Sequence, residues 1–379
     1  MSTTAITLCH GNLIPALSDY FLNKNIKNAF IIASKTGWEQ NNFHEIFERA
    51  NFEFNYTLFH DFTPLPTLLE VQAACQIANT VKAQVIIAIG GGTAIDLAKS
   101  VSVLMSTSPE TAAEAICSSA DISLTKACPL IAIPTTAGSG SEVTQFAAIY
   151  VDGEKYSLSS PSMMPDLSLV DGTMSYSTPQ SVAASCALDA LCQAIESFWA
   201  VDATALSQTN ALKAIDLLTN NIDNAVLHKD PIACNALAEA AALAGQAINI
   251  SKTTAAHAYS YYLSSQHTIQ HGHAVSLCFP AVAYCNFHAH EIYLSRHDFD
   301  ERFSQLFAMV EVDNINQFVS WFQSLMNRLG LSADLRQLGF DFDEEWLTFV
   351  GAVNFERLSN NPSKIDLNSF QRFLKEGLC

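Results

Sequence analysis

The chain has 379 residues, enough for about two to three domains, and 49% of them are hydrophobic, so it can bury a sizeable core. Thirty-seven acidic residues against nineteen basic ones give a formal net charge of −18, which disfavours nucleic acids and anionic membranes as partners. Its apolar runs, such as residues 85–89, are too short to cross a bilayer, and the N-terminus lacks an export signal. We therefore expect a soluble cytoplasmic protein.

The ten cysteines are scattered without any CxxC pair. This spacing argues against a disulfide scaffold and against a zinc ribbon. Cysteine packs like a small apolar residue, so we expect most of these side chains to be buried in the core.

The first half of the chain alternates short β-like runs with helical patterns. The strand candidates are compact, apolar and rich in branched residues, and they cover residues 29–34, 54–59, 85–90 and 130–136. A helical pattern covers residues 68–82. This rhythm is typical of βαβ units and of a largely parallel, Rossmann-like sheet.

After about residue 178 the composition changes to long stretches rich in Ala, Leu, Gln and Glu. The expected helices lie at residues 181–200, 205–222, 231–248 and 316–330, with few strand candidates between them. We predict an α/β domain over residues 1–178 and an all-helical domain over residues 179–379, with the boundary between Tyr176 and Gln180.

The motif GGGTAIDLAKS (90–100) directly follows a predicted strand. Consecutive glycines let the backbone turn sharply and approach a phosphate, and a helix beginning near Thr93 offers unpaired N–H groups and a positive dipole end to an anion. The motif predicts a diphosphate cradle. It is not the GxGxxG of dinucleotide-binding proteins, so it does not name the ligand, and an ordinary glycine-rich turn stays open.

A second motif, PTTAGSGSEVT (134–144), also follows an apolar strand. Thr135, Thr136 and Ser139 supply hydroxyl groups that suit a ribose or a phosphate, although a bland polar loop has the same composition. Ligands of open α/β sheets bind beyond the carboxyl ends of the strands. Two such loops after consecutive predicted strands therefore strengthen the prediction of a ligand site.

The helical half holds one carboxylate, one amide and two imidazoles at suggestive spacings. Asp189 and Gln193 are four residues apart, which places them on one side of a helix, and His257 and His271 follow later in the chain. A carboxylate with imidazoles suits a first-row divalent ion, and such a site keeps room for a substrate. On spacing alone, Asp189 and Gln193 could equally lie on a solvated helix face, and the spacing of the histidines could arise by chance.

Five motifs in order resemble the iron-containing, or group III, alcohol dehydrogenase family. They are GGGTAIDLAK (90–99), PTTAGSGSEVT (134–144), PDLSLVD (165–171), ALDALCQAIES (187–197) and AAHAYSYYLSSQHTIQHG (255–272). The resemblance implies the dehydroquinate synthase-like fold of that family, with an NAD(P)-binding α/β domain and a helical metal-binding domain. It also implies hydride transfer between a nicotinamide and an alcohol or aldehyde, and a homodimer or larger homo-oligomer. The residues PTTAGSGSE (134–142) and TTAAH (253–257) are unlike those of dehydroquinate synthase itself.

Carried over by position, the resemblance assigns Gly91, Gly92 and Thr93 to the pyrophosphate loop, with Asp96 capping or hydrogen-bonding nearby. Thr135, Thr136 and Ser139 match the second cofactor loop, and Lys155 matches a lysine that reaches the nicotinamide ribose. The metal ligands map to Asp189, Gln193, His257 and His271, where the family uses iron or zinc. His271 and His267 are the residues expected to act in catalysis, His267 as a proton relay in competition with a ribose hydroxyl or water.

Three departures from the family pattern have physical consequences. Gln193 replaces a histidine, and an amide oxygen is a harder and usually weaker donor, so we expect lower metal affinity. Ser34, followed by Lys35, replaces an aspartate of many NAD-specific members, which favours either NADPH or the use of both cofactors. Tyr261 replaces a histidine near the active site of many relatives.

Gln193 and the segments around His257 and His271 also resemble a phosphonoacetaldehyde reductase branch, less closely than the five motifs resemble the family. That weaker resemblance implies reduction of phosphonoacetaldehyde to 2-hydroxyethylphosphonate. An anionic aldehyde needs a cation in its pocket, and Lys252, His273 and Arg296 are the candidates. A maleylacetate reductase or a dehydrogenase of neutral alcohols is the enzymatic alternative. A catalytically silent nucleotide-binding relative, with Gln193 marking a decayed metal site, is the alternative of another class.

Overall fold

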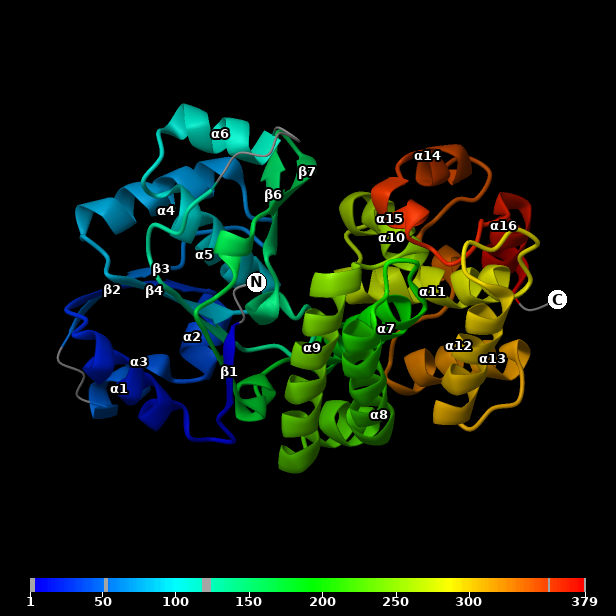
Figure 1. Cartoon of the computed structure of the whole chain (residues 1–379), viewed down its shortest axis with the longest axis horizontal. Coiled ribbons are helices and arrows are strands. Elements are labelled where there is room, and N and C mark those ends of the chain that lie inside the picture. Colours follow the sequence, from blue (N-terminus) through cyan, green and yellow to red (C-terminus); the bar gives the residue numbers. More distant parts are fainter. Residues whose placement is uncertain (1–3, 51–53, 118–123, 354, 378–379) are drawn as a thin grey trace. The chain divides into compact units, whose positions relative to one another are not determined.

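The structure, a computed structural model, describes residues 4–50, 54–117, 124–353 and 355–377. Its contacts divide the chain into two compact units, Met1–Ser177 and Thr178–Cys379 (Figure 1). The first unit combines a parallel sheet with helices, and the second is built of helices. The predicted class of fold is confirmed.

The first unit is organised by a six-stranded parallel sheet in the order β1-β8-β5-β4-β2-β3. The strands are β1 (Ala5–Leu8), β2 (Asn28–Ala33), β3 (Asn55–Phe59), β4 (Val85–Gly90), β5 (Leu130–Pro134) and β8 (Leu167–Val170). A separate antiparallel hairpin is formed by β6 (Phe146–Val151) and β7 (Glu154–Ser159). The sequence patterns predict β2 to β5 but miss the other four strands.

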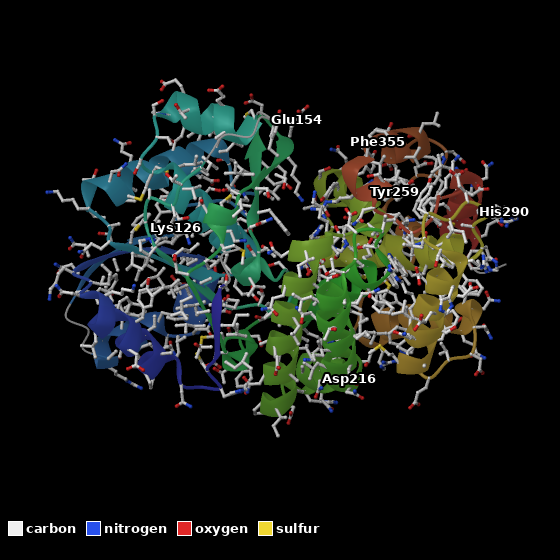
Figure 2. The ribbon with its side chains drawn as sticks, viewed as in Figure 1. Lys126, Glu154, Asp216, Tyr259, His290 and Phe355 are labelled. Atoms are coloured by element: carbon white, nitrogen blue, oxygen red, sulfur yellow. The ribbon has the colours of Figure 1, made fainter. Side chains whose placement is uncertain are left out.

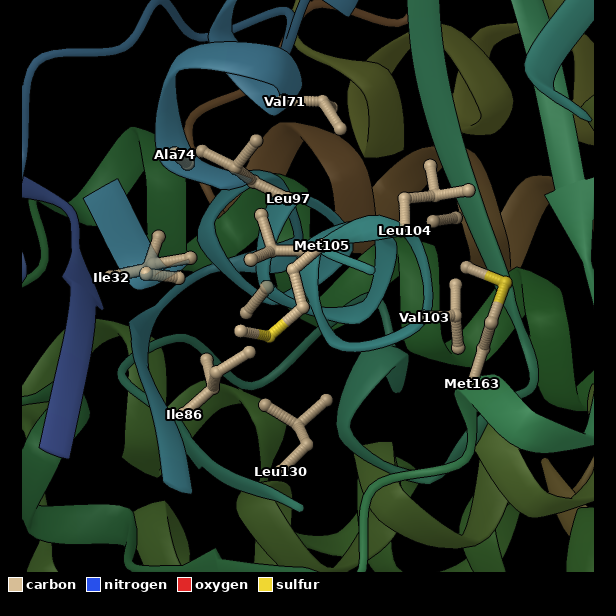
Figure 3. Close-up of a cluster of buried hydrophobic side chains, with 14 of the residues drawn as sticks. Ile32, Val71, Ala74, Ile86, Leu97, Val103, Leu104, Met105, Leu130 and Met163 are labelled. Atoms are coloured by element: carbon tan, nitrogen blue, oxygen red, sulfur yellow. The ribbon is translucent and has the colours of Figure 1, made fainter. Parts of the chain in front are cut away.

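Helices cover both faces of this sheet (Figure 1). One face carries α1 (Leu13–Lys24), α2 (Lys35–Gln40) and α3 (Phe43–Ala50), and the other carries α4 (Leu68–Thr80), α5 (Gly92–Leu104) and α6 (Pro109–Cys117). Side chains alternate along each strand, so Ile87 packs toward the first layer. Ile86 packs toward the second layer, in the cluster of buried side chains that Figure 3 shows. Three short 3₁₀ turns, Ser141–Val143, Pro161–Met163 and Gly172–Ser175, complete the unit.

The second unit contains ten α-helices within the described residues. They are α7 (Gln180–Trp199), α8 (Ala205–His228), α9 (Pro231–Ser251), α10 (Ala255–Gln266), α11 (His271–Phe287), α12 (Arg296–Met309), α13 (Ile315–Arg328), α14 (Trp346–Gly351), α15 (Phe355–Ser359) and α16 (Leu367–Glu376), with a 3₁₀ turn at Leu335–Leu338. Two of the long helices begin at strong caps. The Thr204 capping box precedes α8, and Asp230 caps α9, whose first residue is Pro231.

Aromatic side chains fill the interior of the helical unit. Trp199, at the end of α7, stacks on Phe279 of α11 with ring centroids 5.5 Å apart. Tyr259 of α10, labelled in Figure 2, packs on Phe370 of α16 with ring centroids 4.7 Å apart. Six of the nine described cysteines are buried, as the sequence predicts. No helix among the described residues is long and apolar enough to span a membrane.

Candidate functional site

Three loops meet at the carboxyl ends of neighbouring strands in the α/β unit. Ser34 follows β2, the glycine triplet ends β4, and Thr135 follows β5. Ser34 N donates to Ile89 O at 2.9 Å, and Thr135 N donates to Gly90 O at 3.0 Å. The two motifs singled out in the sequence therefore lie side by side at the sheet edge where α/β proteins bind ligands.

The glycines are needed because the loops approach too closely for side chains. A Cβ on Gly92 would lie 3.0 Å from Ser139 Oγ, and one on Gly91 would lie 3.2 Å from Thr136 Oγ1. Gly91 is the N-cap of α5 and gives that helix no side-chain cap. The first N–H groups of α5 therefore face a backbone-lined cradle of the kind that suits an anion.

Asp96 and Lys99 brace the second loop from within α5. Asp96 accepts a hydrogen bond from Ser141 Oγ at 2.5 Å and from Ala148 N at 2.9 Å. The fully buried Lys99 Nζ donates to Ser141 Oγ and Thr144 Oγ1, both at 2.8 Å. Asp96 thus hydrogen-bonds near the loop rather than capping the helix, and Lys99 is a bracing residue that the sequence analysis missed.

Burial perturbs the charges of this network. Burial lowers the pKa of Lys99 to about 8, although Asp96 and Glu142 oppose the shift. Burial likewise raises the pKa of the Glu142 carboxyl to about 7. Lys99 keeps its position because its ammonium group has several hydrogen-bond acceptors.

Lys155 lies on the β6–β7 hairpin, opposite Tyr150. Tyr150 N donates to Pro66 O, and Thr93 Oγ1 donates to Pro64 O, each at 2.8 Å. The segment 64–67 therefore ties the hairpin that carries Lys155 to the N-terminus of α5. That segment is a part of the site that no sequence motif indicated.

Ser34 caps α2, since its Oγ accepts a hydrogen bond from Gly37 N at 3.1 Å. Gly37 is packed so tightly that a Cβ there would lie 2.5 Å from Ser34 Oγ. The adjacent Lys35 is exposed. The loop after β2 thus presents a neutral cap next to an exposed cation.

In the helical unit, Asp189, His257 and His271 bring ligand atoms within 4.8 Å of one another. His257 Nε2 lies 3.3 Å and His271 Nε2 4.0 Å from Asp189 Oδ1. Atoms bound to one ion at about 2.0–2.2 Å lie roughly 3 to 4 Å from one another, so this spacing fits a divalent metal. Asp189 and His257 are buried, whereas the His271 side chain is 41% exposed, which leaves one side of the cluster open.

Gln193 joins the cluster through its amide. Gln193 Nε2 donates to Asp189 Oδ2 at 3.1 Å. Its Oε1 is buried and, like His257 Nε2, has no hydrogen-bond partner among the described residues. A cation would satisfy these two buried atoms, and both side chains contact the Asp189 carboxylate, so the residues present fit a divalent ion.

Glu196 holds the other side of His257, and the sequence analysis missed it. Glu196 Oε2 pairs with His257 Nδ1, and Glu196 Oε1 accepts from Thr254 Oγ1 at 2.7 Å and Ala256 N at 2.9 Å. This contact puts the ring proton on Nδ1 and turns Nε2 toward Asp189. The available signal was a glutamate seven residues after Asp189, on the same side of a buried helix.

Electrostatics at His257 favour positive charge. Burial alone lowers the pKa of His257, but the Glu196 and Asp189 carboxylates outweigh it and raise the pKa to about 9. The same carboxylates attract a metal cation, which competes with the proton for Nε2.

His271 reaches the cluster because α11 begins against α7. A Cβ on Gly272 would lie 2.0 Å from Ser185 O and 2.7 Å from Asp189 Cβ, so only glycine allows this approach. The His257 and His271 rings are 5.6 Å apart between centroids. Helices α7, α10 and α11 thus assemble a site from residues 82 positions apart in the chain.

The remaining predicted residues have other partners. His267 Nε2 lies 2.6 Å from Glu345 Oε2, and His273 Nε2 lies 2.7 Å from Ser332 O. Arg296 pairs with Asp300 on the exposed face of α12. Lys252 is exposed at the end of α9. The relay role of His267 and the substrate roles of His273, Lys252 and Arg296 stay predictions.

Family models match both units. The model for iron-containing alcohol dehydrogenase matches residues 6–172, and the C-terminal model of the Fe-containing alcohol dehydrogenase family matches residues 183–378. The chain therefore belongs to the iron-containing alcohol dehydrogenase family, as the motifs predict.

Individual relatives support the same family assignment. The chain is 31% identical over 310 residues to the bifunctional aldehyde-alcohol dehydrogenase AdhE of Escherichia coli (strain K12), covering 74% of this chain but 35% of that protein. It is 30% identical over 302 residues to the sulfoacetaldehyde reductase of Bilophila wadsworthia, covering 78% and 77% of the two chains. The crystal structure of sulfoacetaldehyde reductase from Bifidobacterium kashiwanohense in complex with NAD+ superposes with a TM-score of 0.88 at 25% identity, covering 99% and 96%. The chain spans about a third of the length of AdhE.

Proposed function

We propose that this protein is a metal-dependent oxidoreductase that transfers a hydride between NAD(P)H and a short aldehyde or its alcohol. The observation that carries the proposal is the cluster of Asp189, His257 and His271, with the orphaned Gln193 Oε1 beside it. Family membership supports the same chemistry. A silent nucleotide-binding relative fits less well, because a decayed metal site would not keep buried donors without partners.

The cofactor is held by the α/β unit in this proposal. Gly91, Gly92 and the first N–H groups of α5 bind the pyrophosphate, and Thr135, Thr136 and Ser139 offer hydroxyl groups to the ribose or phosphates. The NAD+ complex of a structural relative supports a nicotinamide dinucleotide. Ser34 and Lys35 favour NADPH or dual use, because an aspartate that would repel a 2′-phosphate is replaced by a neutral residue beside a cation.

The metal is held by Asp189, Gln193, His257 and His271, as Fe²⁺ or Zn²⁺. When bound, such an ion supplies Lewis-acid chemistry to a carbonyl oxygen. Glu196 keeps the His257 proton on Nδ1, so that Nε2 presents its lone pair to the cluster. Gln193 Nε2 holds Asp189 through Oδ2 while its own Oε1 stays available. The exposed side of His271 is where a substrate gains access.

The substrate class we propose is a short aldehyde that carries an anionic group, with phosphonoacetaldehyde and sulfoacetaldehyde as the two candidates. The sulfoacetaldehyde reductases among the relatives support an anionic two-carbon aldehyde. Neutral alcohols and maleylacetate are the competing substrates. Steady-state assays of the purified protein with each aldehyde, using NADH and NADPH in turn, separate these possibilities.

The test of the proposal is His271→Ala, with His297→Ala as its matched control. His297 lies on α12 with a side chain 86% exposed. We expect H271A to lose its bound metal and at least roughly a thousandfold in kcat/KM for aldehyde reduction. The substitution removes one metal ligand, and that ligand borders the open side of the site. H297A should match the parent. Metal content by mass spectrometry and NAD(P)H oxidation by absorbance are the measurements, and full activity in metal-free H271A would refute the proposal.

A further inference from the structure

The turn between α10 and α11 carries His271 into the metal cluster, and its backbone is strained. His267 is the C-cap of α10, and its N donates to Leu263 O at 3.1 Å. The next residue, Thr268, has a positive φ of 55°, which β-branched residues rarely adopt. Helix α11 then begins at His271. Strain of this kind persists only where surrounding contacts hold it, so the turn depends on a contact from outside.

Glu345 supplies such a contact from 78 residues farther along the chain than His267. Its Oε2 accepts hydrogen bonds from His267 Nε2 at 2.6 Å and from Tyr262 Oη at 3.0 Å. A carboxylate has no proton to give, so Nε2 of His267 is the donor. The His267 side chain is 13% exposed and that of Glu345 is 23% exposed, which keeps the pair largely away from water. Hydrogen bonds to a charged acceptor are stronger than neutral ones, so this contact can hold the turn.

Glu345 is itself fixed by the segment that precedes α14. Asp341 N donates to Glu345 Oε1 at 3.0 Å, and Glu345 N donates to Asp341 O at 2.8 Å. Asp341 Oδ1 in turn accepts from Asp343 N at 2.8 Å and from Glu344 N at 3.2 Å. Glu345 is the N-cap of α14, which packs against α10 (Figure 1). The carboxylate therefore has a defined position from which to hold His267.

The electrostatics of this contact favour a charged acceptor. Burial alone would raise the pKa of Glu345, but hydrogen bonds from the Asp341 backbone, His267 and Tyr262 outweigh it and hold the pKa below its usual value. Burial and the hydrogen bond to Glu345 raise the pKa of Tyr262, so its hydroxyl keeps the proton that it donates. Phe340 packs on the His267 ring with centroids 5.7 Å apart and covers the pair.

His271 lies between two anchored residues. On its C-terminal side, His273 N donates to Ser185 Oγ at 3.0 Å, and His273 Nε2 lies 2.7 Å from Ser332 O. On its N-terminal side, the anchor is His267. The His271 side chain is 41% exposed, so its position depends on the backbone that carries it more than that of a fully packed ligand would. A contact that fixes His267 therefore bears on where His271 points.

We infer that Glu345 is a positioning residue for the metal site, which acts through His267 to fix the turn that presents His271 to Asp189 and His257. The inference rests on the proposed function, because it concerns the affinity of the same site for its metal. It gives His267 a structural task in place of the proton relay expected from the sequence. A relay would affect turnover and leave metal affinity unchanged, whereas a positioning pair affects metal affinity itself.

The experiment measures metal binding to the full chain without any substrate. Competition with a chromophoric chelator gives the affinity for Zn²⁺ and Co²⁺, and the visible absorption of the Co²⁺ form reports the ligand geometry. We expect Glu345→Ala and His267→Phe each to lower the affinity roughly fivefold and to shift the Co²⁺ band. Phenylalanine keeps a ring beside Phe340 but has no proton to donate. Glu345→Gln should lie between E345A and the parent, because it keeps an acceptor oxygen without the charge.

Two controls separate positioning from a general loss of charge or stability. Glu344→Ala removes the same charge from an exposed side chain one residue earlier, so E344A should match the parent. Tyr262→Phe removes the other donor to Glu345 Oε2 but leaves the contact with His267, so Y262F should keep the parental affinity and Co²⁺ band even if it melts at a lower temperature. The double variant of E345A and H267F should lose no more affinity than E345A alone, because both changes remove one contact.

Several results would overturn the inference. A folded E345A with the parental affinity and Co²⁺ band would do so, and so would losses that add in the double variant. If H267F keeps its metal and loses only kcat, His267 is a relay and the positioning role is wrong. The proposed function fails separately, when the parent itself binds neither Zn²⁺ nor Co²⁺. A parent that binds metal beside an unchanged E345A contradicts the role of Glu345 alone.

Discussion

The two units build their sites in opposite ways. The α/β unit uses backbone, with glycines and hydroxyl groups drawn from short segments at the ends of β2, β4 and β5. The helical unit uses charged and polar side chains brought together from α7, α10 and α11. The first kind of site is damaged by adding atoms and the second by removing them. Each substitution below tests one side of that difference.

The largest effect should come from Glu196→Gln in the helical unit. Glu196 accepts hydrogen bonds from His257 Nδ1, Thr254 and Ala256. Glutamine lacks the negative charge, and its NH₂ group would face one of these N–H or O–H donors instead of accepting from it. We expect metal affinity to fall roughly 10- to 100-fold, as is typical when a carboxylate behind a ligating histidine is lost. Competition with a chromophoric chelator measures this affinity.

A matched control for this change is Glu301→Gln on the exposed face of α12. It removes the same charge from an exposed side chain that pairs with His297 and with no proposed metal ligand, so the metal affinity of E301Q should equal that of the parent. Parental metal binding in E196Q would show that His257 does not depend on Glu196 for its orientation.

On the other side of the comparison, Gly92→Ala adds one methyl group to the cofactor cradle. The new Cβ would lie 3.0 Å from Ser139 Oγ, so the second loop must shift. We expect KM for the cofactor to rise roughly tenfold, because overpacking of this size costs about 1–3 kcal/mol, while bound metal stays constant. Gly351→Ala, where a Cβ meets nothing within 4 Å, is the control. A rise in KM with equal loss of metal would mean that the two sites do not behave independently.

Gln193→His tests the family pattern within the helical unit. An imidazole is a stronger donor to iron or zinc than an amide oxygen, so retention of metal should improve roughly fivefold during dialysis against a chelator. The substitution also removes the Gln193 Nε2 bond to Asp189, which limits the gain. Faster loss of metal in Q193H would mean that the amide matters more as a support for Asp189 than as a ligand.

The same contrast explains which parts of the site could be predicted from the sequence. Both proposed cofactor loops follow a strand directly, so a local motif of about ten residues defines each one. Asp189 and Gln193 are one helical turn apart and were predictable as a pair. Their meeting with His257 and His271 required the family resemblance, because spacing along the chain does not determine tertiary contact.

Glu196 shows what sequence reasoning could not reach. A glutamate inside a helix resembles a solvated face, and only full burial against His257 reveals its partner. The β6–β7 hairpin, also missed, could have been predicted from the sequence, because Asp152 and Gly153 form a tight turn with positive φ between two alternating strands.

The smallest effect is expected from Ser34→Asp, which changes one charge at the edge of the cofactor site. Aspartate caps helices as well as serine does, so the hydrogen bond from Gly37 N and the start of α2 should be kept. The new carboxylate repels a 2′-phosphate and accepts bonds from a ribose, so the ratio of kcat/KM with NADH to that with NADPH should rise about threefold. Lys35→Gln, which removes the neighbouring cation without adding an acid, should move the ratio in the same direction by less. Initial rates with both cofactors measure the ratio, and an unchanged value in S34D would place the adenosine ribose away from the loop after β2. In that case the preference for NADPH loses its structural basis, whereas the glycine cradle, which depends on other residues, is unaffected.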